Sequence, residues 1–318
     1  MSATLGSLAF LWARPETTPG TAATGDYHQL GFMRADLLPR QELLDVRVLG
    51  LGTGRDASDP MQGAFSVEGE LEVPINHAGF GHWLRLLFGP PATTGAAPDF
   101  THVFASGAAS LPSNTLVLDY GPALGSARHL QALGVRGNTL GVEFGTSGPA
   151  TARIGVIGLA AAMLASPGAG TPVVAAGPLF NRITGSIARG GAPLALITEA
   201  SLEFSNGIEA LRTIRDDNRI AAAIPQQTSV TGRITARFAE GGLQLEAAAG
   251  TPVDLEMGWQ ASPTRAIGFR IPRAFLSRPS APIEGPGGVS AGFEVMGSAE
   301  GVAAALTVTL RNAVESYA

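Results

Sequence analysis

Polar and apolar residues alternate along much of the chain with the period of a β-strand. In residues 66–73, three glutamates alternate with apolar or small residues, so they project from one face of a predicted strand. The same alternation marks residues 199–204, 230–238, 269–275 and 306–311. The chain also has 42 glycines and only 15% charged residues, which suits many short strands joined by tight turns. The sequence therefore predicts an all-β fold.

Residues 77–89 depart from this pattern. They place Phe80, Trp83, Leu84 and Leu87 at helical spacing and end at Gly-Pro-Pro, so we expect one amphipathic helix among the strands. Trp83 and Phe88 could stack on a nucleotide or a sugar. Aromatic residues on such a helix more often pack in the core or against another subunit.

The chain repeats a pattern at an offset of roughly half its length. Residues 43–56 and 66–71 match residues 202–216 and 229–234, and the helix has a shorter counterpart at 242–250. Residues 141–145 and 152–159 match 292–297 and 305–310 in the same order. The alternative is that any two stretches of β-sheet look alike. The repeat predicts an N-terminal arm (1–30), a first domain (31–165), a linker (166–177) and a second domain (178–318).

Composition excludes several kinds of chemistry. The chain has no cysteine, and all 21 of its basic residues are arginine, so disulfides, thiol nucleophiles and lysine-based catalysis are excluded. The net charge of −5 argues against a protein that wraps nucleic acid, because such a protein needs basic residues to neutralise phosphates.

Short motifs add no catalytic or metal site. Residues 50–54 form a Gly-x-Gly-x-Gly run without a following apolar helix, and residues 288–292 resemble a nucleophile elbow without its strand-turn-helix context. The five histidines lack metal-ligand spacing. The longest apolar run, residues 154–165, is shorter than the roughly 20 residues of a spanning helix. We expect no catalytic residue, no metal, no cofactor, no export signal and no membrane insertion.

The region around the predicted helix resembles a known family. Val-Pro at 73–74, the segment Gly-His-Trp-Leu-Arg-Leu-Leu-Phe-Gly-Pro-Pro-Ala-Thr-Thr-Gly at 81–95, Thr-His-Val-Phe at 101–104, Ser-Gly at 106–107 and residues 111–116 are similar to the major tail tube proteins of long-tailed (siphovirus-type) bacteriophages. Residues 201–206 and 306–312 resemble later strands of that family. The resemblance covers most of residues 38–318.

The resemblance implies a β-sandwich or barrel with a flanking helix, six copies of which close into a ring on assembly. Together with the repeat, it predicts an all-β protein of two tandem tail-tube-like β-sandwich or barrel domains, each with a short flanking helix. The rings would stack around a lumen that conducts DNA. Because each chain carries two such domains, we expect three chains to form a ring with pseudo-six-fold symmetry.

The resemblance also implies partners and a location. The partners are further copies of the chain, tail tip and tail terminator proteins, and the tape measure protein and genomic DNA in the lumen, without sequence-specific binding. The protein would be assembled in the host cytoplasm and reside in the tail of the virion.

Two sets of residues are candidates for these contacts. An acidic lumen would be lined by Glu68, Glu70, Glu72, Glu199 and Glu203. In the second half, Thr231, Arg233, Thr235 and Arg237 stand where the first half has glutamates, which argues against a uniformly acidic lumen. Contacts between subunits or rings are predicted for Trp83, Leu87, Phe88, Arg55 and Asp56. Loops at 50–61 and 89–99 and the N-terminal arm are expected to reach the next ring.

Other functions fit the same pattern less closely. The protein could be a tail-tip or adaptor ring component, or the tube of a contractile secretion device. From another class, a β-sandwich hydrolase or glycan-binding module could use the aromatic residues. The sequence favours a structural subunit that is not an enzyme.

Overall fold

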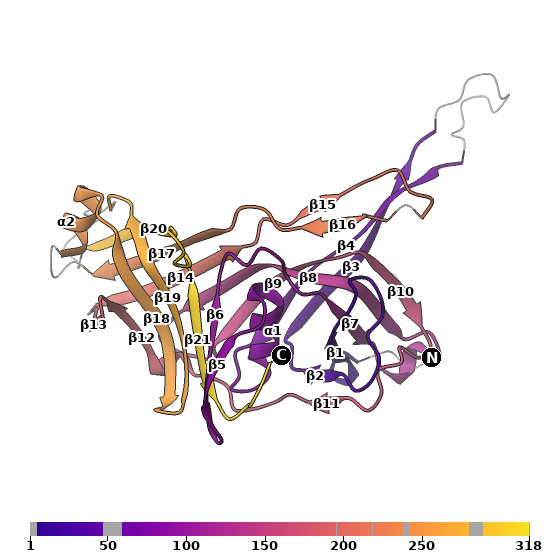
Figure 1. Cartoon of the computed structure of the whole chain (residues 1–318), viewed down its shortest axis with the longest axis horizontal. Helices are drawn as coiled ribbons and strands as arrows, with labels where there is room; N and C mark the ends of the chain where they lie inside the picture. The colour runs from indigo at the N-terminus through magenta and orange to yellow at the C-terminus, as the bar shows by residue number, and fades with distance from the viewer. Residues whose placement is uncertain are drawn as a thin grey trace.

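The protein is a mostly β molecule, as the sequence predicts (Figure 1). The computed structural model describes residues 5–46, 59–194, 196–217, 219–237, 242–279 and 289–317. Within these residues, two α-helices and three short 3-10 helices stand among the strands.

The first half of the chain contains, in order, η1 (Gly6–Leu8), β1 (Phe10–Pro15), β2 (His28–Leu30), β3 (Arg34–Leu44), β4 (Met61–Pro74), α1 (Phe80–Phe88), β5 (Ala92–Ala96), β6 (Asp99–Ala105), β7 (Asn114–Asp119), η2 (Pro122–Leu124), β8 (His129–Phe144), β9 (Thr151–Gly158) and β10 (Ala160–Leu164).

The second half contains β11 (Val173–Val174), η3 (Arg182–Thr184), β12 (Gly185–Arg189), β13 (Ala192–Pro193), β14 (Ile197–Ser205), β15 (Glu209–Leu211), β16 (Ala222–Ile224), β17 (Ser229–Arg237), α2 (Gly242–Ala249), β18 (Val253–Ser262), β19 (Arg265–Leu276), β20 (Ser290–Gly297) and β21 (Thr307–Asn312). The alternating runs of the sequence lie on β4, β14, β17, β19 and β21, and both predicted helices are present.

One long sheet crosses both halves of the molecule in the order β3-β4-β9-β8-β14-β17-β20. The first part of β8 leaves this sheet to pair with β7 and β10, and β1 and β2 extend that layer. In the second half, β19 pairs in the same way with β18 and β21, and β12 and β13 follow beyond β18. The β5–β6 hairpin joins the outer side of β21.

Strand β8 passes from one layer to the other near Gly134. This glycine has φ +64, and a Cβ atom there would lie 2.5 Å from the Leu159 side chain. A left-handed conformation and a crowded neighbour together favour glycine at this position. The turn in β8 lets the long sheet and the smaller layer share one strand.

The strand pairings of the two halves correspond. The first half pairs β1–β2, β1–β7, β7–β8, β8–β10, β8–β9, β9–β4 and β4–β3. The second half pairs β12–β13, β12–β18, β18–β19, β19–β21, β19–β20, β20–β17 and β17–β14. Helices α1 and α2 follow β4 and β17. The main difference is the β5–β6 hairpin of the first half. The second half has no counterpart of it among the described residues, because α2 leads almost directly into β18.

Equivalent glycines set the register of this correspondence. Gly69 on β4 lies opposite Leu37, and Gly232 on β17 lies opposite Leu202. A Cβ atom at either glycine would lie 2.4 Å from a carbonyl oxygen of the partner strand. The structure therefore matches Leu37 with Leu202, whereas the sequence comparison placed Leu43 there.

The later match is also displaced by one strand. The sequence comparison equated residues 141–145, on β8, with residues 292–297, on β20. In the structure β9 and β20 occupy equivalent places, each beside the strand that precedes a helix. The Gly-x-Glu-x pattern that suggested the match occurs on both β8 and β20 because each of these strands presents one polar face.

The N-terminal residues and the expected linker are part of the sheet structure. Strand β1 pairs with β2 and β7, and Leu11, Ala13 and Tyr27 are buried, so these residues do not form a free arm. In the expected linker, β11 pairs in parallel with β2, and the Thr171 amide donates to Asp26 Oδ1 at 2.8 Å. Both segments therefore pack on the first half.

Glu16 fastens the N-terminal segment to the strands beside it. Its carboxylate accepts hydrogen bonds from the Ser113 hydroxyl at 2.7 Å, the Thr115 hydroxyl at 3.0 Å and the backbone amides of Gly20 at 2.9 Å and Gly134 at 2.8 Å. Hydrogen bonds to an ionised acceptor are stronger than neutral ones. This carboxylate links β1, β7 and the turn in β8.

A single core connects the halves. Helix α1 lies against β8 and β6 and buries Trp83, Leu84 and Leu87. The Phe88 ring at its end packs 4.7 Å from the ring of Phe204 on β14. Because the first half's helix and a second-half strand share this contact, the two halves do not form separate cores.

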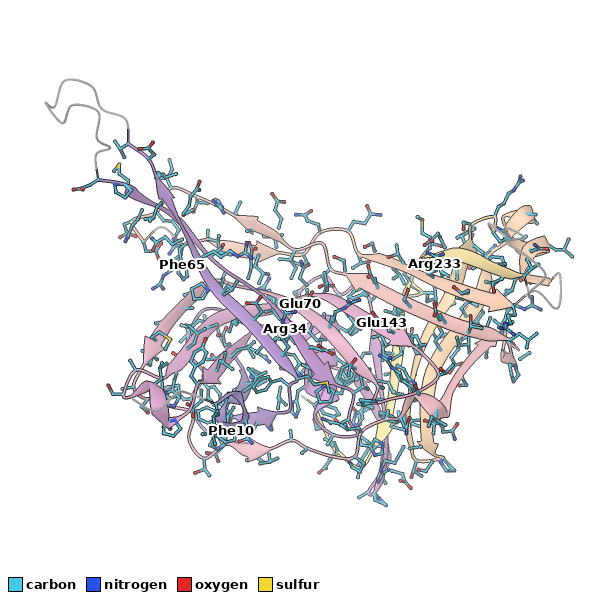
Figure 2. The ribbon with its side chains drawn as sticks, turned by 180° about the vertical axis from the view of Figure 1, so that it is seen from behind. Phe10, Arg34, Phe65, Glu70, Glu143 and Arg233 are labelled. Carbon is cyan, nitrogen blue, oxygen red and sulfur yellow. The ribbon has the colours of Figure 1, made fainter. Side chains whose placement is uncertain are left out.

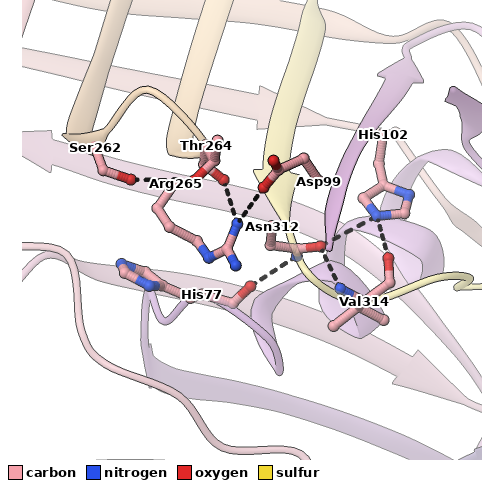
Figure 3. Close-up of polar contacts among 8 residues, drawn as sticks. All are labelled: His77, Asp99, His102, Ser262, Thr264, Arg265, Asn312 and Val314. Atoms are coloured by element: carbon pink, nitrogen blue, oxygen red, sulfur yellow. Dashed lines mark hydrogen bonds and ion pairs between the residues drawn. The ribbon is translucent and has the colours of Figure 1, made fainter. Parts of the chain in front are cut away.

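The C-terminal segment is anchored beside α1 (Figure 3). The Asn312 amide donates to the His77 carbonyl at 2.7 Å, and its Oδ1 accepts from the Val314 amide at 2.9 Å. His102 Nε2 lies 2.9 Å from the Val314 carbonyl oxygen. These contacts turn the chain back after β21.

Tyr317 completes this anchor. Its ring is buried, and its hydroxyl donates to the Ala78 carbonyl at 2.6 Å and accepts from the Asn312 amide at 2.7 Å. The ring lies directly against Gly81 of α1, where a Cβ atom would approach it to 2.2 Å. The glycine of the Gly-x-Trp-Leu motif therefore makes room for a side chain 236 positions later in the sequence.

Candidate functional site

The side of the long sheet that faces away from α1 is polar (Figure 2). Glu68, Glu70 and Glu72 on β4 alternate with buried Val67, Leu71 and Val73 and so project from this side. On β14, Glu199 and Glu203 alternate with buried Ala200, Leu202 and Phe204 and join them. The structure brings the five predicted glutamates to one face of one sheet.

Arginines stand among these glutamates. Across β3, β4 and β9, Arg34, Glu72 and Arg153 are successive cross-strand neighbours. Further along the sheet, Arg233 on β17 lies opposite Glu294 on β20. Opposite charges at facing positions favour this register.

The ion pairs on this face are exposed. Arg153 lies 3.1 Å from Glu143, and Arg233 lies 3.9 Å from Glu294. Exposed pairs of this kind contribute about 0–1 kcal/mol each, so they affect the surface potential more than the stability. Carboxylates nevertheless outnumber arginines on the face: the acidic residues are Asp36, Glu68, Glu70, Glu72, Glu143, Glu199, Glu203 and Glu294, and the basic ones are Arg34, Arg40, Arg136, Arg153, Arg233 and Arg237.

A hairpin arm from the second half crosses part of this face. The β15–β16 arm, residues 206–228 where described, leaves β14 and runs along the first half toward β4 (Figure 1). Its Ile220 and Ala223 pack on Ile157 of β9, which is only 7% exposed. The Arg136 guanidinium donates to the Ala223 carbonyl, and burial lowers the pKa of Arg136 below its ordinary value. The arm thus covers an apolar position on the polar face.

Asn206 fixes the base of the β15–β16 arm. Its buried side-chain amide donates to the carbonyls of Leu87, in the last turn of α1, at 2.8 Å and of Gly137 at 2.9 Å. The Ile208 amide donates to Asn138 Oδ1 at 2.9 Å. These bonds direct the chain away from β17 and onto the first half.

The equivalent hairpin of the first half extends away from the sheet. Strands β3 and β4 remain paired out to Leu44 and Met61 and extend beyond the body (Figure 1). We call the segments 40–46 and 59–65 the β3–β4 arm. Leu43 is 66% exposed, and Leu44 and Met61 are also exposed. Apolar side chains on an extended hairpin are typical of a surface that meets another molecule.

The predicted contact residues have different environments. Trp83, Leu87 and Phe88 are buried within the chain and offer no surface to a second subunit, which agrees with the alternative that they pack in the core. Arg55 and Asp56 lie outside the described residues, as does most of the predicted loop at 50–61. The predicted loop at 89–99 forms β5 and the start of β6, an exposed hairpin.

Burial lowers the pKa values of four histidines. The rings of His28 and His82 lie 4.1 Å apart, and burial, together with the charges of His28 and Arg85, lowers the pKa of His82 to about 3. Burial also lowers the pKa values of His28, His77 and His102. Over the described ranges, no three histidine or acidic side chains gather as a metal site would need. No helix there has the length and apolar character to span a bilayer.

Comparison with known families decides the identity of the fold. The sequence model of the family described as phage tail tube protein matches residues 6–297. The chain belongs to this family. The match extends from the start of η1 to the end of β20 and includes both helices and both hairpin arms. No curated protein matches the chain.

Membership of the tail tube family gives the polar face and the arms a context. The protein is a structural subunit of a bacteriophage tail tube and belongs to the tail of the virion. It self-assembles into a tube with other tail proteins. Leu43 and Met296, exposed apolar residues on β3 and β20, were not among the contact residues predicted from sequence, and Met61 was included only as the end of the predicted loop at 50–61. Little in the sequence distinguishes these residues, because single apolar residues on polar strands are common.

Proposed function

We propose that the protein polymerises as stacked rings around a lumen that conducts DNA during ejection. The observation that carries the proposal is the long sheet, which ends at β3. Among the described strands, β3 pairs only with β4, so its other edge presents backbone groups that have no strand partner. Such an edge favours pairing with another chain. A ring of copies would give every β3 a partner.

Three chains form each ring in this proposal. The corresponding pairings of the two halves support two tube repeats per chain, the first of which includes β1 and β2. The β8–β14 pairing, which joins the halves, serves as the junction between repeats. Three chains would then give a ring of six repeats with pseudo-six-fold symmetry.

The polar face of the long sheet lines the lumen in this proposal. Glu68, Glu70, Glu72, Glu199 and Glu203 lie on it with the arginines described above. An excess of carboxylates repels phosphates mildly, while the arginines limit the repulsion. DNA could then pass without being held, since phosphate binding requires an excess of basic groups.

Other tail proteins complete the assembly in this proposal. Tail tip and terminator proteins would bind the two ends of the tube, and the tape measure protein would occupy the lumen before DNA. Assembly would take place in the host cytoplasm. The role is structural, without a catalytic step.

Electron microscopy of the purified protein tests this function. We expect tubes with a central channel of about 40 Å, wide enough for a duplex about 20 Å across. Image averaging should find three identical chains per ring. Six whole chains per ring would contradict the two-repeat arrangement, and dispersed monomers at high concentration would contradict the tube.

A further inference from the structure

The junction between the halves has two parts that act together. Strand β14 pairs with β8 along residues 200–205 and 139–144. Beyond that ladder, the β15–β16 arm turns over the same neighbour and covers Ile157. The second repeat thus offers the edge of its first strand to the first half and lays its arm on the same half.

The structure contains unoccupied counterparts of both parts. In the first half, β3 is equivalent to β14, and the β3–β4 arm is equivalent to the β15–β16 arm. In the second half, the pair Phe275 and Met296 on β19 and β20 is equivalent to Arg136 and Ile157 on β8 and β9. The equivalence follows from Gly158 and Gly297, since Gly158 lies opposite Val67 and Gly297 opposite Val230.

The two equivalent positions differ in exposure. Ile157, beneath the β15–β16 arm, is 7% exposed, whereas Met296 is 63% exposed. Phe275 beside it is half-buried, with the Arg273 guanidinium 5.3 Å from its ring centroid. Met296 is thus an apolar residue on a polar face that lacks the cover its counterpart has.

We infer that the β3–β4 arm of one chain lies over Phe275 and Met296 of the next chain in the same ring. The inference rests on the proposed ring, and it specifies the surface through which neighbouring chains meet. The occupant is a second copy of this chain, because the first half carries the element that covers this position at the junction within the chain.

The arm carries side chains suited to this site. By the β3–β14 correspondence, Leu43 takes the place of Ile208, which packs in the Ile157 cluster. On the returning strand, Met61 takes the place of Ile224. Leu43 is exposed in the single chain, so its contact with Met296 would remove apolar surface of both chains from water, whereas Ile224, the counterpart of Met61, stays 39% exposed.

Gln41 adds a polar contact at the base of the arm. It takes the place of Asn206, whose amide donates to the end of α1 and to the carbonyl of Gly137. In the single chain, the Gln41 amide lies 3.4 Å from Gln62 Oε1 at the surface. In the ring, its amide would donate to carbonyls at the end of α2 and of β19 in the next chain.

Disulfide trapping tests the contact, since the native chain has no cysteine. In assembled L43C/M296C protein, oxidation is expected to close a covalent trimer on a non-reducing gel. Each single variant should remain uncrosslinked. I157C/I208C is the positive control, because its link lies within one chain and changes only monomer mobility. L43C/M163C is the negative control, since Met163 is exposed on β10, away from the predicted contact.

Electron microscopy of the same samples tests the tube function separately from the contact between chains. Tubes whose L43C/M296C chains stay monomeric, or link into ladders longer than a trimer, would overturn the inference and leave the tube function standing. Absence of tubes in the native protein would overturn both.

A second variant tests the same surface without cysteine. Met296→Asp is expected to lower tube yield by more than about tenfold, because assembly would bury an unpaired carboxylate. Met163→Asp should assemble normally. Circular dichroism should report a folded chain for both variants, and unchanged tube yield from folded Met296→Asp protein would count against the inference.

Discussion

Replacing Gly81 by alanine sets two local effects against each other. Gly81 lies within α1, where alanine is more favourable than glycine by about 1 kcal/mol. The new Cβ atom, however, would approach the buried Tyr317 ring to 2.2 Å, which is far inside van der Waals contact. Either the ring leaves its site or α1 shifts.

The loss is larger than the gain. Removing a large aromatic side chain from a core costs about 3–5 kcal/mol, so displacing Tyr317 should cost a similar amount. After the gain in helix propensity, Gly81→Ala is expected to destabilise the unassembled subunit by about 2–4 kcal/mol. The displaced Tyr317 hydroxyl would also lose its hydrogen bonds to the Ala78 carbonyl and from the Asn312 amide.

A double-mutant cycle measures this conflict directly. Urea unfolding of unassembled subunits, followed by tryptophan fluorescence, gives the free energies of the native protein, Gly81→Ala, Tyr317→Ala and the double variant. In the Tyr317→Ala background the clash is gone, so Gly81→Ala should be neutral or stabilise by up to about 1 kcal/mol. An equal cost of Gly81→Ala in both backgrounds would refute the reasoning.

Three further predictions use the same unfolding assay. Asn206→Ala should destabilise the subunit by about 2–4 kcal/mol, because it leaves the buried carbonyls of Leu87 and Gly137 unpaired, and an unchanged urea midpoint would argue against this role. Glu16→Ala should cost about 2–4 kcal/mol, since it removes a carboxylate that accepts four hydrogen bonds; a loss under about 0.5 kcal/mol would be inconsistent with that network. The pKa of His82 is about 3 in the folded chain against the ordinary value of 6.5, so the unfolded chain binds more protons between these two pH values. The free energy of unfolding should therefore fall as the pH falls from 6.5 toward 3. The contribution of His82 to this fall is up to about 1.4 kcal/mol per pH unit. His82→Gln should flatten that slope, and an unchanged slope would contradict the assignment to His82.

Part of the strand structure could be predicted from local sequence. The alternation at 66–73 and 230–238 marks strands because each has one buried and one exposed face. Strand β1 escaped this reasoning. Its Phe-Leu-Trp-Ala-Arg-Pro sequence is only partly alternating, and its pairing with β7 joins residues about a hundred positions apart. A pairing of that range leaves no local pattern.

The candidate surfaces also include some features that the sequence predicts and others that it does not. The glutamates of β4 and β14 could be predicted to share a face because face follows from strand period. The cover over Ile157 could not be predicted, since it depends on where a hairpin turns after Asn206. Trp83 and Phe88 illustrate the reverse difficulty: helical spacing identifies an apolar side of α1 without telling whether core or another subunit covers it.

The β8–β14 ladder has a consequence for how assembly depends on concentration. Since this junction lies within one chain, it forms when the chain folds, and its two sides are held at a high effective concentration by their covalent connection. Only the junctions between chains would remain bimolecular, so in the proposed ring of three chains every second junction would be independent of how many subunits the cell has made. The covalent link also frees the two repeats from having to be identical, which allows the first to carry the β5–β6 hairpin and a straight arm while the second carries neither.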